Sequence, residues 1–127
     1  MGYRSEVVLA ISKQIMPHFL AVLAKEPETR SLIFKHHDHL DQNYNNEGTL
    51  LVTWGGIKWY DSYPEIQAIN EFIQEAEGDG IEGFELPENE WQGNHVRFVR
   101  LGEEYDDCDS RGELHYGDIH MERSLCY

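Results

Sequence analysis

The side chains with the clearest chemical potential in this chain are carboxylates, and they gather in its second half. Residues 64–127 hold seventeen acids and four arginines, whereas residues 1–63 hold seven acids and six lysines or arginines. The densest stretch, residues 102–109, places five acids in eight positions. A one-sided charge of this kind bears on the partners that a protein attracts and on its solubility, rather than on its fold. Such carboxylates could bind a basic protein surface, imitate nucleic-acid phosphates or hold a divalent cation.

Some of these acids fall on a predicted helix that gains nothing from them. Glu71 and Glu75 lie one turn apart, and a like-charge pair at this spacing costs roughly 0.2–0.5 kcal/mol. Glu75 and Glu77 also stand near the predicted C-terminus, where the helix dipole disfavours anions. No lysine between residues 64 and 77 compensates them. Either a basic partner or solubility, and not folding, favours these acids.

The acidic stretch also suggests a cation site. Asp107 and Asp109, with Asp118 further on, are spaced like part of an EF-hand calcium loop. That loop needs an oxygen ligand at its fifth position, where this chain has Arg111, and it needs a helix on either side. The residue types favour loose cation binding over a true calcium loop.

A second cluster has the residue types that bind zinc. His36 and His39 are three residues apart, so on a helix they would share one face, with Asp41 nearby. The segment is similar to the end of the metal-binding signature of metallo-β-lactamase-type hydrolases, with Phe34 in place of its first histidine. A metal-binding protein or small hydrolase using residues 36–41 is therefore one alternative hypothesis.

Aromatic residues are dense between positions 54 and 64. Trp59 and Tyr60 could anchor a partner, because Trp and Tyr dominate interface hot spots. The alternative is that they pack the junction between a strand and a helix. Base stacking on them would need a basic groove, and ten lysines and arginines against twenty-four acids do not supply one. Direct nucleic-acid binding is not expected.

No nucleophile or phosphate-binding motif is present. The chain lacks G-x-S-x-G, the P-loop, G-x-G-x-x-G and C-x-x-C. The sequence therefore predicts a protein that is not an enzyme and has no cofactor.

The elements that position these residues follow from hydrophobic periodicity and from Pro and Gly punctuation. Their order, β-α-α-β-α-β-β-β, predicts a single α+β domain over residues 1–127, a largely antiparallel sheet with two to three helices packed on one face. Gly55 and Gly56 should bend or bulge the second strand. The expected strands are 6–11, 49–54, 83–86, 95–101 and 119–125; the expected helices are 17–25, 30 to about 40, and 64–77; the expected loop is 41–48.

Composition places the chain among globular proteins of the cytoplasm. No apolar run approaches the roughly 20 residues of a membrane helix, and Glu6 interrupts what would be the core of a signal peptide. Cys108 and Cys126 are then expected to be thiols. No membrane partner is expected, and self-association as a homodimer stays open.

Three segments carry a resemblance to a group of proteins. Residues 1–7 (MGYRSEV), 57–66 (IKWYDSYPEI) and 98–107 (FVRLGEEYDD) resemble, in this order, small acidic proteins encoded by bacteriophages and prophages. That group has no assigned activity to carry over. The resemblance implies a phage gene product that acts in the bacterial host cytoplasm. Residues 29–47 and 79–94 lie outside it.

These observations combine into one leading hypothesis. The protein is expected to be a non-enzymatic inhibitor that binds a host protein with a basic, nucleic-acid-binding surface, such as a component of a defence system, as an anti-CRISPR protein or nucleic-acid mimic would. The other alternative is a structural or assembly protein of the phage, bound through the aromatic segment. The expected partner-binding residues are Glu71, Glu75, Glu103, Glu104, Asp106, Asp107, Asp109, Trp59 and Tyr60.

Overall fold

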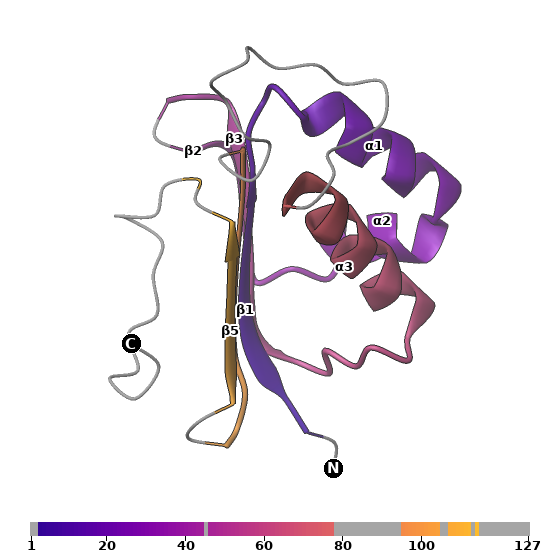
Figure 1. Ribbon diagram of the computed structural model, residues 1–127, viewed down its shortest axis with the longest axis vertical. Coiled ribbons are helices and arrows are strands. Elements are labelled where there is room, and N and C mark those ends of the chain that lie inside the picture. The colour runs from indigo at the N-terminus through magenta and orange to yellow at the C-terminus, as the bar shows by residue number, and fades with distance from the viewer. Residues whose placement is uncertain (1–2, 45, 78–94, 105–106, 113, 115–127) are drawn as a thin grey trace.

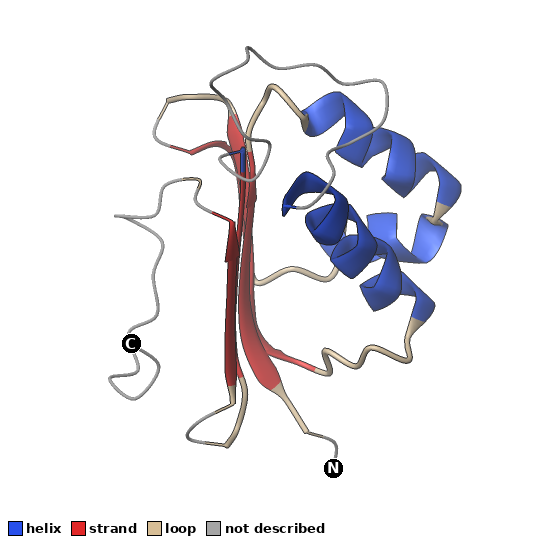
Figure 2. Ribbon diagram, viewed as in Figure 1, coloured by secondary structure: helices blue, strands red, loops and turns tan. Residues whose placement is uncertain are grey.

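The protein is an α+β fold in which one sheet is covered on one face by helices, as the sequence predicts. The computed structural model describes residues 3–44, 46–77, 95–104, 107–112 and 114. In these residues the sheet has five strands and is accompanied by three helices. Figure 1 shows the strands as one layer with all three helices on the same side, and Figure 2 shows the two layers by secondary structure. In chain order the elements are β1 (Ser5–Ile11), α1 (Met16–Lys25), α2 (Pro27–Phe34), β2 (His39–Tyr44), β3 (Thr49–Ile57), α3 (Pro64–Glu77), β4 (Val96–Leu101) and β5 (Cys108–Gly112).

The sheet is antiparallel throughout its described pairs, with the order β2-β3-β1-β4-β5. The apolar run of β1 suits its central position, because both of its faces are buried: Leu9 belongs to the main core, and Ala10 belongs to a second, smaller cluster with Val99. The register of β1 with β3 shifts between Ser5 and Val7, whose partners are Ile57 and Trp54. The extra residue on β3 falls at Gly55 and Gly56, which confirms the predicted bulge.

The core lies between the sheet and the helices. Alternate residues of β1, β3 and β4 point toward the helices, and Leu9, Val52 and Phe98 are at most 1% exposed. Helices α1 and α3 meet there through Phe19 and Phe72, whose ring centroids are 5.0 Å apart. This packing holds α3 over β4 and β5.

The second helix differs from the prediction at both ends. It begins at Pro27 instead of Arg30, because proline is well suited to the first turn and Glu26 alone separates the two helices. Within α2, Thr29 is buried, and its hydroxyl donates to the carbonyl oxygen of Glu65 at 3.1 Å, which joins α2 to α3. The helix ends at Phe34, so residues 35–40 are not helical as expected.

Two strands occur where none was expected. Strand β2 pairs with β3 from His39 opposite Thr53 to Tyr44 opposite Thr49, although its sequence is mostly polar. Strand β5 pairs with β4 from Cys108 opposite Leu101 to Gly112 opposite Arg97. Both are edge strands of the described sheet, where polar side chains are tolerated and the apolar pattern is weak. The strands expected at 83–86 and 119–125 lie outside the described residues.

A candidate binding cleft between α3 and the sheet edge

The inner face of the sheet changes from apolar to polar beneath α3. On β4, buried Phe98 is followed two residues later by Arg100 on the same face. The register sets Arg111 opposite Phe98 and Asp109 opposite Arg100, so all four side chains share the face that α3 covers. Charged residues thus occupy a place where apolar packing would stabilise the fold more.

The facing side of α3 is polar as well. Its apolar stripe, which includes Ile69, Phe72 and Ile73, is buried in the core. The adjoining flank carries polar residues at helical spacing, namely Gln67, Asn70, Glu71 and Gln74. The helix therefore seats one face on the core and turns a row of amides and one carboxylate toward β5.

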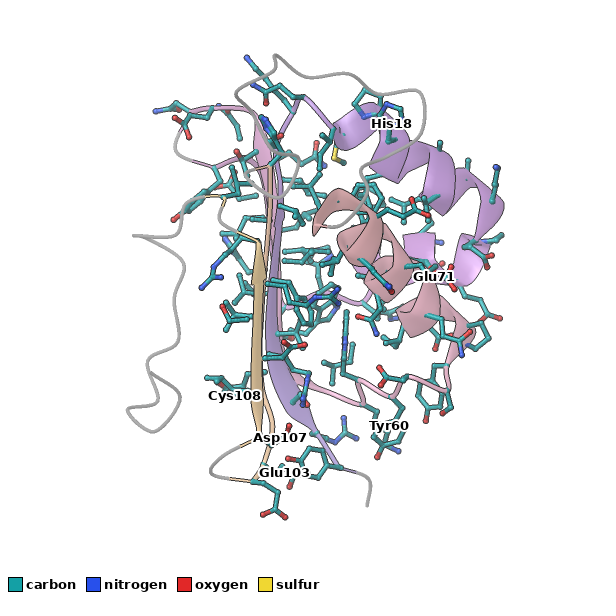
Figure 3. All side chains as sticks on the ribbon, viewed as in Figure 1. His18, Tyr60, Glu71, Glu103, Asp107 and Cys108 are labelled. Atoms are coloured by element: carbon teal, nitrogen blue, oxygen red, sulfur yellow. The ribbon has the colours of Figure 1, made fainter. Side chains whose placement is uncertain are left out.

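A cavity of about 520 Å³ separates these two polar walls. Tyr3 and Asp61 contribute to its rim, and Asp107 completes the sheet wall. Its lining contains four carboxylates and two guanidinium groups, a net charge of −2. Figure 3 shows Glu71 on the helix and Asp107 near the end of the sheet edge, which are the two walls of this cleft.

Asp107 is already neutralised by its neighbours. Arg100 donates to both of its carboxylate oxygens, from Nη2 to Oδ1 at 2.7 Å and from Nη1 to Oδ2 at 3.1 Å. The Tyr3 hydroxyl donates to Oδ2 at 2.6 Å and accepts the N–H of Glu104 at 2.8 Å. The tight turn that makes these contacts requires Gly102, because a Cβ there would collide with the Asp107 carboxylate and the Tyr3 hydroxyl.

These contacts shift two pKa values. The hydrogen bonds to Asp107 raise the pKa of Arg100, which stays charged at any ordinary pH. Partial desolvation, followed by the hydrogen bond that it donates to Asp107, raises the pKa of Tyr3 above 10.0. Both groups are held in the protonation state that fixes Asp107 in place.

Two other carboxylates of the cleft remain available. Asp109 is half-buried on β5, and Glu71 is exposed on α3. Within the described residues neither carboxylate makes a hydrogen bond, although Asp109 interacts electrostatically with Arg100. The cleft thus has at its floor one carboxylate whose hydrogen bonds are already made. Each wall carries one further carboxylate that can accept a hydrogen bond from a ligand.

The other residues expected to bind a partner lie around the cleft or beneath it. Trp59 lines the cavity, but it is only 8% exposed and packs between Trp54 and Phe98, with ring centroids 5.4 and 5.6 Å away. Tyr60 is half-buried against Tyr63, whose ring lies 5.2 Å away. These contacts are those of a strand–helix junction, and Tyr60 and Tyr63 each keep part of their surface exposed.

The remaining acids lie outside the cavity. Glu75 is exposed one turn beyond Glu71, and Glu104 is exposed in the turn before β5. The carboxylate of Glu103 accepts the backbone N–H of Arg4 at 2.5 Å. Asp106 lies outside the described residues. The structure therefore brings Trp59, Glu71, Asp107 and Asp109 together and places Glu75, Glu103 and Glu104 outside the cavity.

Sequence reasoning missed the polar residues that accompany the acids. Those residues are Tyr3, Asp61, Gln67, Asn70, Gln74, Arg100 and Arg111. Two sequence patterns could have indicated them. Residues 67, 70, 71 and 74 recur at helical spacing, and residues 107, 109 and 111 alternate as on one face of a strand. Asn70 also donates to Asp61 at 3.0 Å, a pairing that the sequence alone does not indicate.

The histidine cluster is not arranged as expected. Because α2 ends at Phe34, His36 and His39 share no helix face, and His39 opens β2. The His37 ring contacts the Ile33 carbonyl at 2.9 Å, and the Asp38 carboxylate accepts the N–H of Gly55. In the part of the chain that the structure describes, no group of three or more His, Cys, Asp or Glu side chains is placed to hold a metal ion.

Comparison with known proteins identified no relative of this chain. No model of a protein family matches the chain, and neither the curated proteins nor the solved structures contain a significant match. Among the described residues, no helix has the length and apolar character needed to cross a membrane. The cleft therefore has to be interpreted from its own chemistry.

Proposed function

We propose that this protein is a non-enzymatic binding protein whose cleft receives a basic side chain of a partner protein. The observation that carries the proposal is the pair formed by Asp109 and Glu71, which stand on opposite walls of one cavity and make no hydrogen bond in the described residues. Asp107 cannot serve in the same way, because Arg100 and Tyr3 occupy it.

A guanidinium group fits this arrangement better than an ammonium group. Guanidinium is planar, holds five N–H donors in a fixed fork and is less strongly hydrated. Carboxylates on two walls, with the side-chain oxygens of Gln67 and Gln74 beside Glu71 on the helical wall, offer several acceptors. The preferred ligand is therefore an arginine on the partner's surface.

The charge of the whole chain supports the same type of partner. A net charge of −14 attracts a basic protein from a distance and repels nucleic-acid phosphates. The partner is therefore a protein with a basic surface, and direct nucleic-acid binding is disfavoured. Because arginine-rich surfaces are common where proteins contact nucleic acids, occupying one would block such a protein.

The biological setting comes from the resemblance to small acidic phage proteins. On that basis the partner is a host protein in the bacterial cytoplasm, such as a nucleic-acid-binding component of an anti-phage defence system. The protein would then act as an inhibitor that competes with nucleic acid for the partner's basic surface.

A direct test uses short labelled peptides that contain arginine, lysine or citrulline at the same positions, with binding followed by fluorescence polarisation. The arginine peptide should bind most tightly and citrulline least. Asp109→Asn and Glu71→Gln should each weaken arginine binding about tenfold, the effect of losing one charge-assisted hydrogen bond. Glu28→Gln, which removes an exposed acid from α2, is the matched control and should change little.

The host partner itself can be sought by capture from a nuclease-treated bacterial lysate. A partner held by the cleft should elute between about 0.05 and 0.5 M salt, because ions screen exposed charge pairs. It should also be absent when Asp109→Asn is the bait. Equal loss with Glu28→Gln would show that net charge, and not the cleft, determines capture.

A further inference from the structure

The helical layer carries a second hollow, which is apolar. It lies at the corner between α1 and α2 and has a volume of about 640 Å³. Leu20 and Ala24, one turn apart on α1, form one wall, and Pro27 and Phe34 of α2 form the other. Leu20 is 46% exposed and is the only large hydrophobic side chain so exposed in the described residues. The exposed part of Leu20 does not contribute to the core, whereas Phe34 is partly buried against it.

The charge around this groove is opposite to that of the chain. Arg30 and Lys35 line it, and no acid does. Both are exposed, and within the described residues neither forms an ion pair. Lys35 follows the last residue of α2, where the helix dipole favours a cation, but Arg30 has no such reason to be there. In a chain with twenty-four acids, a cationic rim around an apolar hollow calls for a ligand that is both acidic and apolar.

We propose that this groove, defined by Leu20, Ala24, Pro27 and Phe34 with Arg30 and Lys35 at its rim, binds an acidic amphipathic helix of a partner protein. Leu20 and Ala24 lie one turn apart on α1, and Pro27 and Phe34 lie two turns apart on α2, so the groove can accept another helix through apolar anchors at helical spacing. The carboxylates on the polar face of that helix would lie against Arg30 and Lys35.

A second copy of this chain does not supply such a helix from its described residues. The acidic helix α3 has its apolar stripe, including Ile69 and Phe72, buried in its own core. It could offer carboxylates to the groove but no apolar anchor. No described helix of a second copy therefore fits the groove, and we assign its occupant to another protein.

The groove is separate from the cleft. The two hollows share no lining residue, and they select ligands of opposite charge. This inference therefore does not rest on the proposed function of the cleft. A protein with both sites could hold a basic and an acidic surface at the same time.

The test is a selection from a displayed library of helical peptides of random surface charge, with the purified full-length protein as target. The enriched peptides should be net negative and should carry apolar residues one turn apart. The best of them, synthesised with a fluorescent label, should bind about tenfold more weakly to Leu20→Glu and to Arg30→Glu. Ala21→Glu adds the same carboxylate at a neighbouring exposed position, and Lys13→Glu reverses a charge elsewhere; both should bind within about twofold of the unmodified protein.

Several results would overturn the proposal. Enrichment of neutral or basic peptides, no enrichment at all, or binding that survives Leu20→Glu would each do so, provided circular dichroism shows the variants folded. Loss of peptide binding with Asp109→Asn would place the peptide in the cleft instead. A dimer seen by sedimentation velocity and abolished by Leu20→Glu would assign the groove to a second copy. Binding of anionic vesicles that depends on Arg30 would assign it to a lipid surface.

Discussion

At the scale of single residues, the cleft is organised around a carboxylate that is no longer available to bind. Asp107 is held by Arg100 and Tyr3, while the backbone N–H of Gly102 donates to its carbonyl oxygen at 2.8 Å. The arginine side chain is 19% exposed and the aspartate 33%, so solvent screens the pair and its net contribution to stability is modest. Its role is to fix the floor of the cleft and to hold Arg100, so that no hydrogen bond from Arg100 occupies Asp109 or Glu71.

The contact between Tyr3 and Asp107 should make stability depend on alkaline pH. The pKa of Tyr3 is raised in the folded state relative to the unfolded value of 10.0, so the folded protein keeps a proton that the unfolded chain loses. The stabilisation is complete below about pH 10 and is lost as the pH rises through the folded pKa. Urea unfolding should therefore show that the advantage over Tyr3→Phe is constant from neutral pH to about pH 9 and shrinks above pH 10. An advantage that grows with pH would contradict the contact.

Trp59 should matter to folding more than to binding. It is almost buried, and its ring packs against Trp54 and Phe98. Trp59→Ala should lower the free energy of unfolding by about 3–5 kcal/mol, as for other large aromatic residues removed from a core. Trp59→Phe should recover most of this loss, and its affinity for the arginine peptide should be close to that of the unmodified protein. A Trp59→Phe variant that is stable but does not bind would instead make the indole part of the site.

At the scale of elements, the cleft depends on where β5 ends. Gly112, the last residue of β5, has a φ of +76°, and a Cβ there would collide with the carbonyl oxygen of Val96. Gly112→Ala should therefore cost about 1–3 kcal/mol and loosen the strand that carries Asp109 and Arg111. Gly56→Ala is the matched control, because the nearest atom to its Cβ would be 4.0 Å away. Thermal unfolding should separate the two variants; equal midpoints would show that β5 does not need this backbone conformation.

The elements with strong periodicity were predictable from the sequence, and the polar edges were not. The apolar run of β1 and the stripe of α3 led to the correct elements, because burial selects residue types on a fixed period. Strands β2 and β5 were not predicted, since an edge strand of polar residues shows no period that separates it from a turn. The error at residues 35–40 has a similar origin: an apolar spacing continued past the point where α2 ends.

The difference between local and long-range patterns also decides which residues of the cleft could be predicted from the sequence. The acids Glu71, Asp107 and Asp109 were singled out because they are charged and concentrated. The pairing of Arg100 with Asp107 was not, although the two residues are only seven apart, because it depends on the turn between β4 and β5. The position of α3 opposite β5 is set by contacts between residues far apart in the chain, and no local sequence pattern encodes it.

At the scale of the whole molecule, salt should affect folding and binding in opposite directions. A net charge of −14 destabilises the compact state by self-repulsion, which added ions screen. Raising sodium chloride from about 0.05 to 0.5 M should therefore raise the midpoint of thermal unfolding. Over the same range the arginine peptide should bind more weakly. A peptide affinity that does not change with salt would contradict an electrostatic docking site.

The most direct measurement of the central claim is a nuclear magnetic resonance titration of the isotopically labelled protein with the arginine peptide. The account predicts that backbone amide shifts concentrate on residues 67–74, 100–104 and 107–112, the two walls of the cleft and the turn that joins β4 to β5. Titration of the Asp109→Asn variant should greatly reduce these shifts. Shifts spread evenly over exposed acids elsewhere, such as Glu6 and Glu28, would contradict the account, because they would show attraction to net charge without a site.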